Sequence, residues 1–200
     1  MKRVLVAYAT MAGSTMEVAE AVGEEFTRQG VQADVRPISE IENLEGYDGV
    51  VVGGPMIMGW HREAGRFLKK NKRVFSDVPL AIFVMALSLT DIGAMEIEGV
   101  AVSVDQDLPK PPQDERRLSF RERYATLGRY LGPIIKSTRP TKPVSIGVFG
   151  GRLEYGRLKW WAVLFVMLVI QAPAGDRRNW EVIRSWAAEL PALMQIPTND

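Results

Sequence analysis

The chain has 200 residues, 46% of them hydrophobic and 24% charged, which is the balance of an ordinary globular domain. Its 25 basic and 24 acidic side chains leave a formal net charge of +1, so composition gives no electrostatic support for nucleic-acid binding. With no cysteine and one histidine, neither a thiolate site nor a histidine-based metal site is expected, and redox chemistry would need an organic cofactor. The N-terminal residues lead directly into a strand pattern without a cleavable signal peptide, from which we expect a cytoplasmic location.

The first predicted elements are a strand and the helix that follows it. Residues 3–9 form a short apolar run rich in β-branched and aromatic types, as in a strand covered on both faces. From Ser14 onward apolar residues recur at spacings of three and four, which predicts a helix with Gly30 as its C-terminal cap. Further strands are predicted at 31–37, 49–54, 80–87 and 144–149. Further helices are predicted near 39–44, 62–73, 119–137 and 178–195.

The stretch 88–118 interrupts this alternation. Its glycines and prolines predict a long loop around a β-leaning run from Val100 to Val104. The remaining pattern of five strands alternating with helices predicts an α/β fold, with a parallel sheet covered by helices on both faces. We find no second core, and expect residues 1–200 to form a single domain.

Small polar residues follow the first strand, where open parallel sheets usually bind phosphate. The segment lacks the glycine patterns of dinucleotide and nucleoside-triphosphate sites, but it places the hydroxyls of Thr10, Ser14 and Thr15 around Gly13 at a helix N-terminus. Unpaired N–H groups, the helix dipole and hydroxyl donors suit one terminal phosphate monoester. The alternative is that Ser14 and Thr15 only cap the helix.

Two segments carry a resemblance to a known family. Residues 9–15 (ATMAGST) and 51–55 (VVGGP) resemble the two FMN loops of flavodoxins, and the likeness extends over residues 1 to about 150. The resemblance implies a flavodoxin-like three-layer sandwich with a five-stranded parallel sheet in the order 2-1-3-4-5. It also implies FMN as the cofactor.

The same resemblance implies the residues that contact FMN. For the phosphate loop they are Thr10, Met11, Ala12, Gly13, Ser14 and Thr15. For the loops after the third and fourth strands they are Pro55, Met56, Ile57, Trp60, Ala86, Leu87 and Ser88. Trp60 would cover one face of the flavin, with plain packing as its alternative role. The fourth-strand loop has no aromatic residue, and an open flavin face suits a substrate that must lie on the ring.

A narrower resemblance is to the flavodoxin-type, quinone-linked protoporphyrinogen dehydrogenases. It is carried by Gly59-Trp60-His61, by residues 150–155 (GGRLEY), and by Ala174-Gly175-Asp176 before a tryptophan-bearing final helix. It implies an enzyme that passes electrons from a protoporphyrinogen-like small molecule to a quinone. The alternatives are a flavodoxin electron carrier and an NAD(P)H:quinone reductase.

Candidate substrate residues follow from the same segments, and no catalytic acid or base is assigned. Arg152 and Arg157 are suited to bind substrate carboxylates such as propionates, and Tyr155 lies between them. A solvated or lipid-facing cluster is the alternative for these arginines. His61 is the remaining candidate, with a surface or capping role as its alternative.

An apolar insert is predicted at about 152–176. Its residues 160–170 are continuously apolar. As a helix they would extend about 16 Å, against the roughly 30 Å of a bilayer core, so they cannot span it. Basic residues flank the run, so residues 157–173 indicate peripheral contact with the inner face of the cell membrane. A homo-oligomer interface and internal burial are the alternatives.

Overall fold

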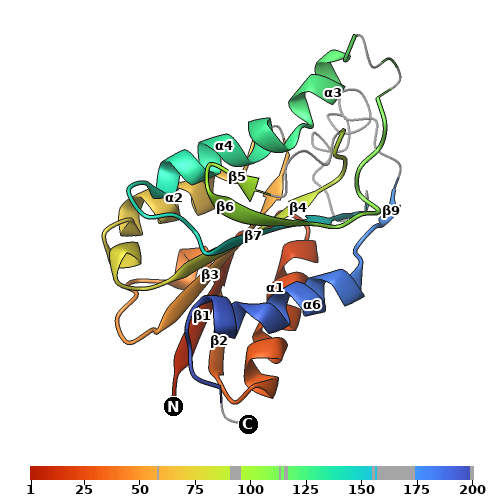
Figure 1. Cartoon of the computed structure of the whole chain (residues 1–200). Coiled ribbons are helices and arrows are strands. Elements are labelled where there is room, and N and C mark those ends of the chain that lie inside the picture. Colours follow the sequence, from red (N-terminus) through yellow and green to blue (C-terminus); the bar gives the residue numbers. More distant parts are fainter. Residues whose placement is uncertain are drawn as a thin grey trace.

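A computed structural model of the chain describes residues 1–57, 59–90, 96–112, 114, 117–154, 156 and 174–198. Its centre is one sheet with a layer of helices on each face (Figure 1). The architecture is the predicted α/β sandwich.

Five parallel strands form the middle of the sheet. They are β1 (Arg3–Tyr8), β2 (Gln32–Pro37), β3 (Gly49–Met56), β4 (Leu80–Ala86) and β7 (Ser145–Gly150). Their spatial order, β2-β1-β3-β4-β7, is the expected 2-1-3-4-5 when these five are numbered along the chain. The register pairs Tyr8 with Gly53, and Ala86 with both Met56 and Gly150, so the carboxyl ends of β1, β3, β4 and β7 form one edge.

The sheet has seven strands, so the prediction of five was wrong. The strand β6 (Val100–Val104) pairs in parallel with β7, and β5 (Glu96–Ile97) pairs antiparallel with β6. Both lie within 88–118, which was predicted as a long loop. The run from Val100 to Val104 becomes a strand because β7 offers it a hydrogen-bonding edge, a partner that local sequence does not reveal.

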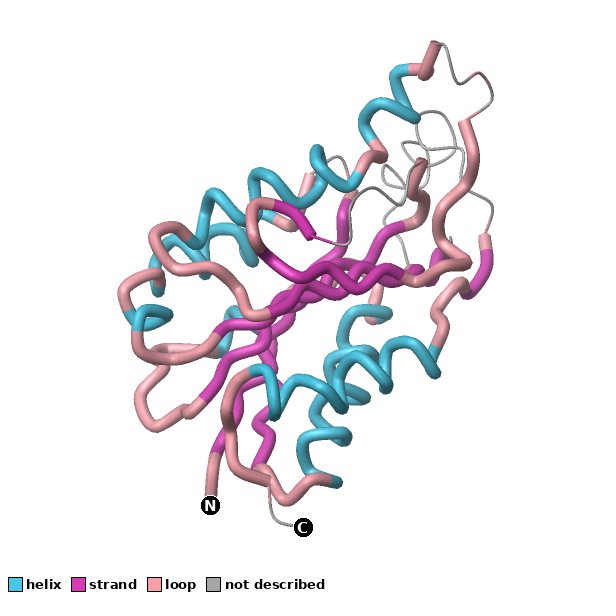
Figure 2. Tube along the Cα trace, in the orientation of Figure 1, coloured by secondary structure: helices cyan, strands magenta, loops and turns pink. Residues whose placement is uncertain are grey.

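Two pairs of helices enclose this sheet (Figure 2). On one face lie α1 (Ser14–Arg28) and α6 (Trp180–Leu193), which pack against each other and form one apolar core with the sheet. On the other face lie α2 (Arg62–Asn71) and α4 (Leu127–Thr138), which form the apolar core on that side of the same sheet.

Two predicted helices are shorter in the structure. The pattern near 39–44 forms only the 3-10 turn η1 (Ile38–Glu40), after which the Asn43 side chain accepts the Glu45 N–H at 3.1 Å. The pattern near 119–137 forms α3 (Phe120–Tyr124) and α4. The break falls at Ala125, whose carbonyl accepts the Thr90 N–H at 2.9 Å. A second 3-10 turn, η2 (Val74–Ser76), follows α2.

A small hairpin marks the predicted insert. The strands β8 (Arg152–Leu153) and β9 (Gly175–Asp176) pair antiparallel, with Arg152 opposite Asp176. The chain therefore leaves and rejoins the domain at one place. Residues 157–173, for which membrane contact was predicted, lie outside the described residues. Among the helices that the structure describes, none is long and apolar enough to cross a membrane.

Candidate functional site

The loop between β1 and α1 is shaped by its own polar groups. Ala9 donates its N–H to the Gly53 carbonyl at 2.9 Å, which ties the start of the loop to β3. The Thr10 hydroxyl oxygen accepts the Gly13 N–H at 2.9 Å. Gly13 has a φ of 92°, a left-handed conformation that favours glycine, and it is the N-cap residue of α1. The loop therefore places the N-terminus of α1 at the carboxyl edge of the sheet.

Several donors at this helix terminus have no partner among the residues that the structure describes. Thr15 is 1% exposed, and its hydroxyl makes no hydrogen bond. In the described ranges, the main-chain N–H groups of Met11, Ala12, Ser14 and Thr15 also find no protein acceptor. A buried unpaired polar group costs about 1–3 kcal/mol, and a phosphate oxygen is an acceptor that the positive end of a helix attracts. These residues fit a phosphate group. The N-cap residue of α1 is Gly13, so neither Ser14 nor Thr15 occupies the capping position that was the alternative.

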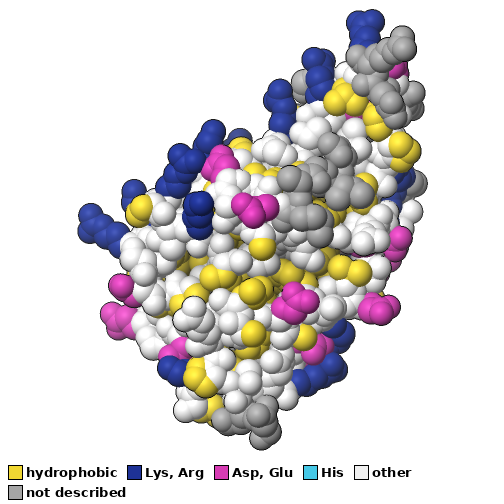
Figure 3. Space-filling view, viewed as in Figure 1, with side chains coloured by type: hydrophobic (Ala, Val, Ile, Leu, Met, Phe, Trp, Pro, Cys, Tyr) yellow, Lys and Arg dark blue, Asp and Glu magenta, His cyan; other side chains and the backbone are white. Residues whose placement is uncertain are grey.

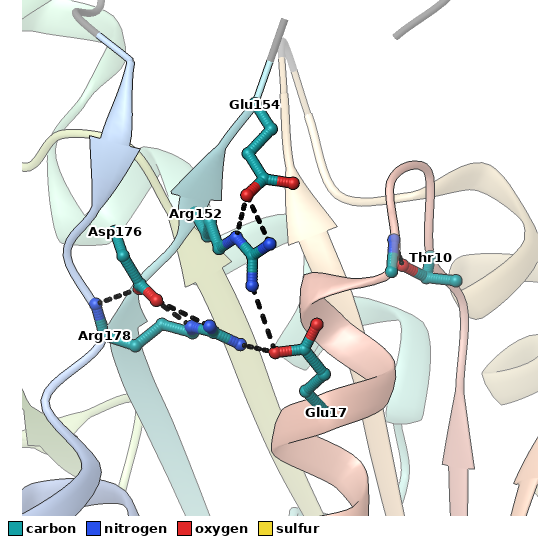
Figure 4. Close-up of polar contacts among 7 residues, drawn as sticks. Thr10, Glu17, Arg152, Glu154, Asp176 and Arg178 are labelled. Atoms are coloured by element: carbon teal, nitrogen blue, oxygen red, sulfur yellow. Dashed lines mark hydrogen bonds and ion pairs between the residues drawn. The ribbon is translucent and has the colours of Figure 1, made fainter. Parts of the chain in front are cut away.

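A carboxylate in the first turn of α1 is held by two arginines (Figure 4). Glu17 Oε2 lies 2.6 Å from Arg178 and 3.5 Å from Arg152. Arg178 also binds Asp176 at 2.6 Å, and Arg152 binds Glu154. The guanidinium groups offset a negative charge that would otherwise repel an anion at this helix terminus. Arg152, predicted to bind substrate carboxylates, is therefore occupied by carboxylates of the protein itself.

The segment after β3 folds back on that strand. Ile57 donates its N–H to the Gly59 carbonyl at 3.0 Å, and His61 donates to the Pro55 carbonyl at 3.1 Å. The Trp60 indole N–H donates to the Gly54 carbonyl at 3.1 Å, so the ring lies across β3, half-buried. At Gly54 a Cβ would lie 3.0 Å from that indole nitrogen, so glycine permits the close approach. Packing, the alternative for Trp60, is the contact that the structure describes.

A cleft of 630 Å³ separates the first loop from α2. Its lining residues are Met11, Pro55, Ile57, Gly59, Trp60, His61, Arg62, Glu63 and Arg66. Four predicted contact residues, Met11, Pro55, Ile57 and Trp60, therefore share one cavity with His61. By contrast, Met56 is 5% exposed and belongs to the core. A cleft of this size and mixed lining suits a small molecule.

The third predicted contact segment is fixed through its carbonyls. Gly151 donates its N–H to the Ala86 carbonyl at 2.8 Å, and the Arg177 guanidinium donates to the Leu87 carbonyl. The Tyr130 hydroxyl donates to the Ser88 carbonyl at 3.1 Å. Burial raises the pKa of the Tyr130 hydroxyl to about 12, so it stays protonated at neutral pH and acts as a donor. The Ala86 side chain is fully buried, which limits its part in any ligand contact to the main chain.

His61 is the substrate candidate that the structure places in the cleft. It is the N-cap residue of α2, but its side chain makes no capping hydrogen bond. Its Nδ1 is buried and has no hydrogen-bond partner in the described part of the chain. The other two candidates, Tyr155 and Arg157, lie outside the described residues.

Sequence reasoning missed the basic residues that line this region. Arg62 and Arg66 belong to the cleft wall, and both are exposed on the surface of α2. Their spacing of four, continued by Lys69 at three more, was a usable signal for one face of a helix. Arg178 was also missed, because its link to Glu17 spans 161 residues of sequence.

The sheet order and the helix N-terminus at its carboxyl edge agree with the expected flavodoxin-like fold. A family model for the flavodoxin domain matches residues 5–179, and the chain belongs to this family. Over 207 aligned residues the chain is 23% identical to the protoporphyrinogen IX dehydrogenase [quinone] of Escherichia coli strain K12, covering 98% of both proteins. The match to the protein of that name from Escherichia coli O157:H7 has the same identity and coverage.

Two solved flavodoxins share the fold. The two-electron reduced flavodoxin of Megasphaera elsdenii aligns with a TM-score of 0.50 at 10% identity, over 93% of this chain and 98% of that one. The Streptococcus pneumoniae TIGR4 flavodoxin aligns with a TM-score of 0.50 at 11% identity, over 95% and 98% of the two chains. These likenesses confirm the predicted flavodoxin-like architecture.

Proposed function

We propose that the chain is an FMN-dependent oxidoreductase that takes electrons from a reduced, protoporphyrinogen-like substrate and delivers them to a quinone. Bound FMN supplies two-electron redox chemistry that the side chains lack. The observation that carries the proposal is the buried, unpartnered Thr15 hydroxyl at the N-terminus of α1, behind the left-handed Gly13. Family membership supports a flavin as the occupant.

The protein's own residues would hold the cofactor at two places. The first loop, Thr10 to Thr15, would bind the phosphate through main-chain N–H groups and hydroxyls. The cleft bounded by Met11, Pro55 and Ile57 would receive the ring system. Leu87 and Ser88 follow β4 at the same edge of the sheet, where Arg177 and Tyr130 hold their carbonyl groups.

The substrate and the acceptor come from the relatives. The name of the Escherichia coli relatives specifies protoporphyrinogen IX and a quinone, and the alignment spans 98% of both chains. The cleft agrees with a substrate that must reach a flavin. Leu87 and Ser88 have no aromatic ring that could cover the flavin. The Trp60 indole N–H is engaged in a hydrogen bond to the Gly54 carbonyl.

The test begins with the absorption spectrum of the purified protein after incubation with FMN. A flavin band is expected, and anaerobic addition of protoporphyrinogen IX should bleach it, with recovery when a menaquinone analogue is added. Bleaching by NAD(P)H but not by the porphyrinogen would make the protein an NAD(P)H:quinone reductase. Exchange with protein partners alone would make it an electron carrier. Failure to take up FMN at all would overturn the redox proposal.

Membrane contact through residues 157–173 and assembly into a homo-oligomer stay predictions. The hairpin of β8 and β9 anchors both ends of the insert beside the Glu17 ion pairs, at the carboxyl edge of the sheet. A lipid-dissolved quinone would then approach on the side of the phosphate loop. Co-sedimentation with vesicles containing anionic lipid, before and after deletion of residues 157–173, tests the membrane contact.

A further inference from the structure

A second groove continues from the cleft along α2. It has a volume of 400 Å³ and lies between α2 and α4, with Pro133, Ile134 and Ser137 contributed by α4. Trp60, His61, Arg62 and Arg66 line both the groove and the cleft. The two hollows therefore adjoin along these four residues.

Three cations line this groove from a single stripe of α2. Arg62, Arg66 and Lys69 stand at spacings of four and three, which places them on one face of the helix. All three are exposed, and in the part of the chain that the structure describes none forms an ion pair. Glu63, on the wall of the cleft, is the nearest acidic side chain in sequence.

This charge belongs to one face of the molecule. The segment 62–73 contains Arg62, Arg66, Lys69, Lys70, Lys72 and Arg73 against a single acid, Glu63. On the opposite layer α1 contains Glu17, Glu20, Glu24 and Glu25 against Arg28. Figure 3 shows Lys and Arg side chains along the upper left margin, over α2 and α4. A chain with a net charge of +1 therefore presents a locally basic groove.

Two further observations indicate that the groove receives a ligand. Gly65 lies inside α2 and lines the groove, yet a Cβ there would meet no atom within 4 Å. Glycine within a helix costs about 0.5–1 kcal/mol of stability relative to alanine. Because no protein atom requires glycine at this position, its presence is consistent with space left for a ligand. His61 Nδ1, on the wall shared with the cleft, is buried without a hydrogen-bond partner.

We propose that this groove binds the carboxylates of the substrate, an amphipathic molecule with a flat apolar body and at least two acid groups. This inference rests on the proposed function and assigns its substrate-binding residues. Arg62, Arg66 and Lys69 bind the acid groups, and Trp60, Pro133 and Ile134 contact the apolar body. Arg152 does not serve this role, because Glu17 and Glu154 already hold it.

The hollow shape favours a small molecule over a membrane. The lining of the groove includes Ile134, which is 2% exposed, whereas a planar lipid surface would contact the tips of the basic side chains. Carboxylates bind arginine in a bidentate manner, which gives orientation as well as attraction. The acid-bearing edge of the ligand would be fixed on α2 while its body extends toward the flavin ring in the neighbouring cleft.

The test uses mesoporphyrin IX, a dicarboxylate that resists oxidation, and follows its fluorescence on binding to the protein with and without added FMN. The variant Arg62→Gln/Arg66→Gln/Lys69→Gln should weaken binding at least about tenfold. The matched control Lys70→Gln/Lys72→Gln/Arg73→Gln removes the same charge from the same region outside the groove and should change binding less than about twofold. The dimethyl ester of mesoporphyrin, in the same detergent, should bind wild type and the triple variant equally.

A steric variant keeps the test decisive if the charge variant folds poorly. Gly65→Met inserts a good helix former into the groove and should also weaken mesoporphyrin binding about tenfold. Gly128→Met, on the exposed surface of α4 where a Cβ also meets no atom within 4 Å, should not. Equal weakening by both triple variants, or full binding by Gly65→Met, would overturn the groove as the site.

The outcomes separate this inference from the function on which it rests. If FMN binds normally to every variant, and mesoporphyrin binds every variant as tightly as it binds wild type, the assignment of the groove is wrong and the redox function stands. If mesoporphyrin follows the predicted pattern while FMN never binds, the groove stands and the redox function is wrong. Loss of binding to anionic phospholipid vesicles in the triple variant, with mesoporphyrin unaffected, would assign the basic face to a membrane instead.

Discussion

The guanidinium group of Arg178 lies 2.6 Å from the carboxylate of Glu17, although 161 residues separate them in sequence. The pair joins the first turn of α1 to the residues that precede α6. Arg178 has a side chain that is 3% exposed, and its guanidinium lies 4.6 Å from the centre of the Trp180 ring. Its fixed position makes it a counter-charge for Glu17 in the first turn of α1.

Removing either member of this pair should have opposite effects on FMN affinity. Arg178→Met leaves Glu17 and Asp176 without their common partner, so we expect weaker FMN binding and a loss of about 2–4 kcal/mol in the free energy of unfolding. Glu17→Gln removes the negative charge near the helix terminus, and should tighten FMN binding roughly two- to fivefold. Urea unfolding and flavin-fluorescence titration measure the two quantities. FMN affinities that move in the same direction would contradict this electrostatic account.

The same cluster predicts a pH dependence of stability. The hydrogen bond from Arg178 lowers the pKa of the Asp176 carboxyl below its ordinary value. A carboxyl with a depressed pKa stabilises the fold above its unfolded pKa of about 3.9, and this contribution is lost as pH falls through the folded pKa. Asp176→Asn should therefore flatten the loss of stability below about pH 4. The midpoint of urea unfolding, measured between pH 7 and 3, reports this change of stability with pH. The control is Asp77→Asn at an exposed position. The same dependence of the midpoint on pH in both variants would contradict the expectation.

Most of the fold followed from local patterns in the sequence. The runs that became β1, β3, β4 and β7 are apolar on both faces, and the spacing after Ser14 gave α1 directly. The predicted loop over residues 88–118 was wrong because the strand β6 within it pairs with residues distant in the chain. β6 exists because Val102 and Val104 pair with Ile146 and Val148.

The site was predicted unevenly for a related reason. The proposed phosphate loop is one contiguous segment, so its hydroxyls and its glycine could be considered together from the sequence, and its role stays a prediction. Arg152 was predicted to be a substrate ligand because local sequence does not reveal its two carboxylate partners. Glu17 lies 135 residues away in sequence, and the sequence does not show that the side chain of Glu154 points toward Arg152. The stripe on α2 could have been found from its spacing, but only the groove with α4 gives it a role.

Two glycines, one in the sheet and one in α2, should respond differently to alanine. At Gly53, on β3, a Cβ would lie 1.9 Å from the ring of the fully buried Phe83, so Gly53→Ala should lower the free energy of unfolding by about 2–3 kcal/mol. At Gly65, where space is open, Gly65→Ala should raise it by about 0.5–1 kcal/mol. Thermal or urea unfolding distinguishes the two. A destabilised Gly65→Ala would show that the glycine serves the fold rather than the groove.

Thr15 provides the most specific prediction for the cofactor. Thr15→Val keeps the shape of the side chain and removes a hydroxyl that is buried and unpaired, so the flavin-free protein should be as stable as wild type or more stable. FMN binding should weaken by roughly 5- to 30-fold, because the phosphate loses a donor. Ser14→Ala, which removes a neighbouring, partly exposed hydroxyl, is the comparison variant and should weaken FMN binding less.

The most direct measurement of the central claim is the ratio of FMN affinity to riboflavin affinity for the flavin-free protein, in wild type and in Thr15→Val. The two ligands differ only by the phosphate, so the account predicts a strong preference of wild type for FMN. In Thr15→Val the preference should shrink, with riboflavin affinity unchanged. Equal affinities for the two ligands in wild type, or a ratio that Thr15→Val leaves unaltered, would contradict the assignment of the β1–α1 loop as the phosphate site.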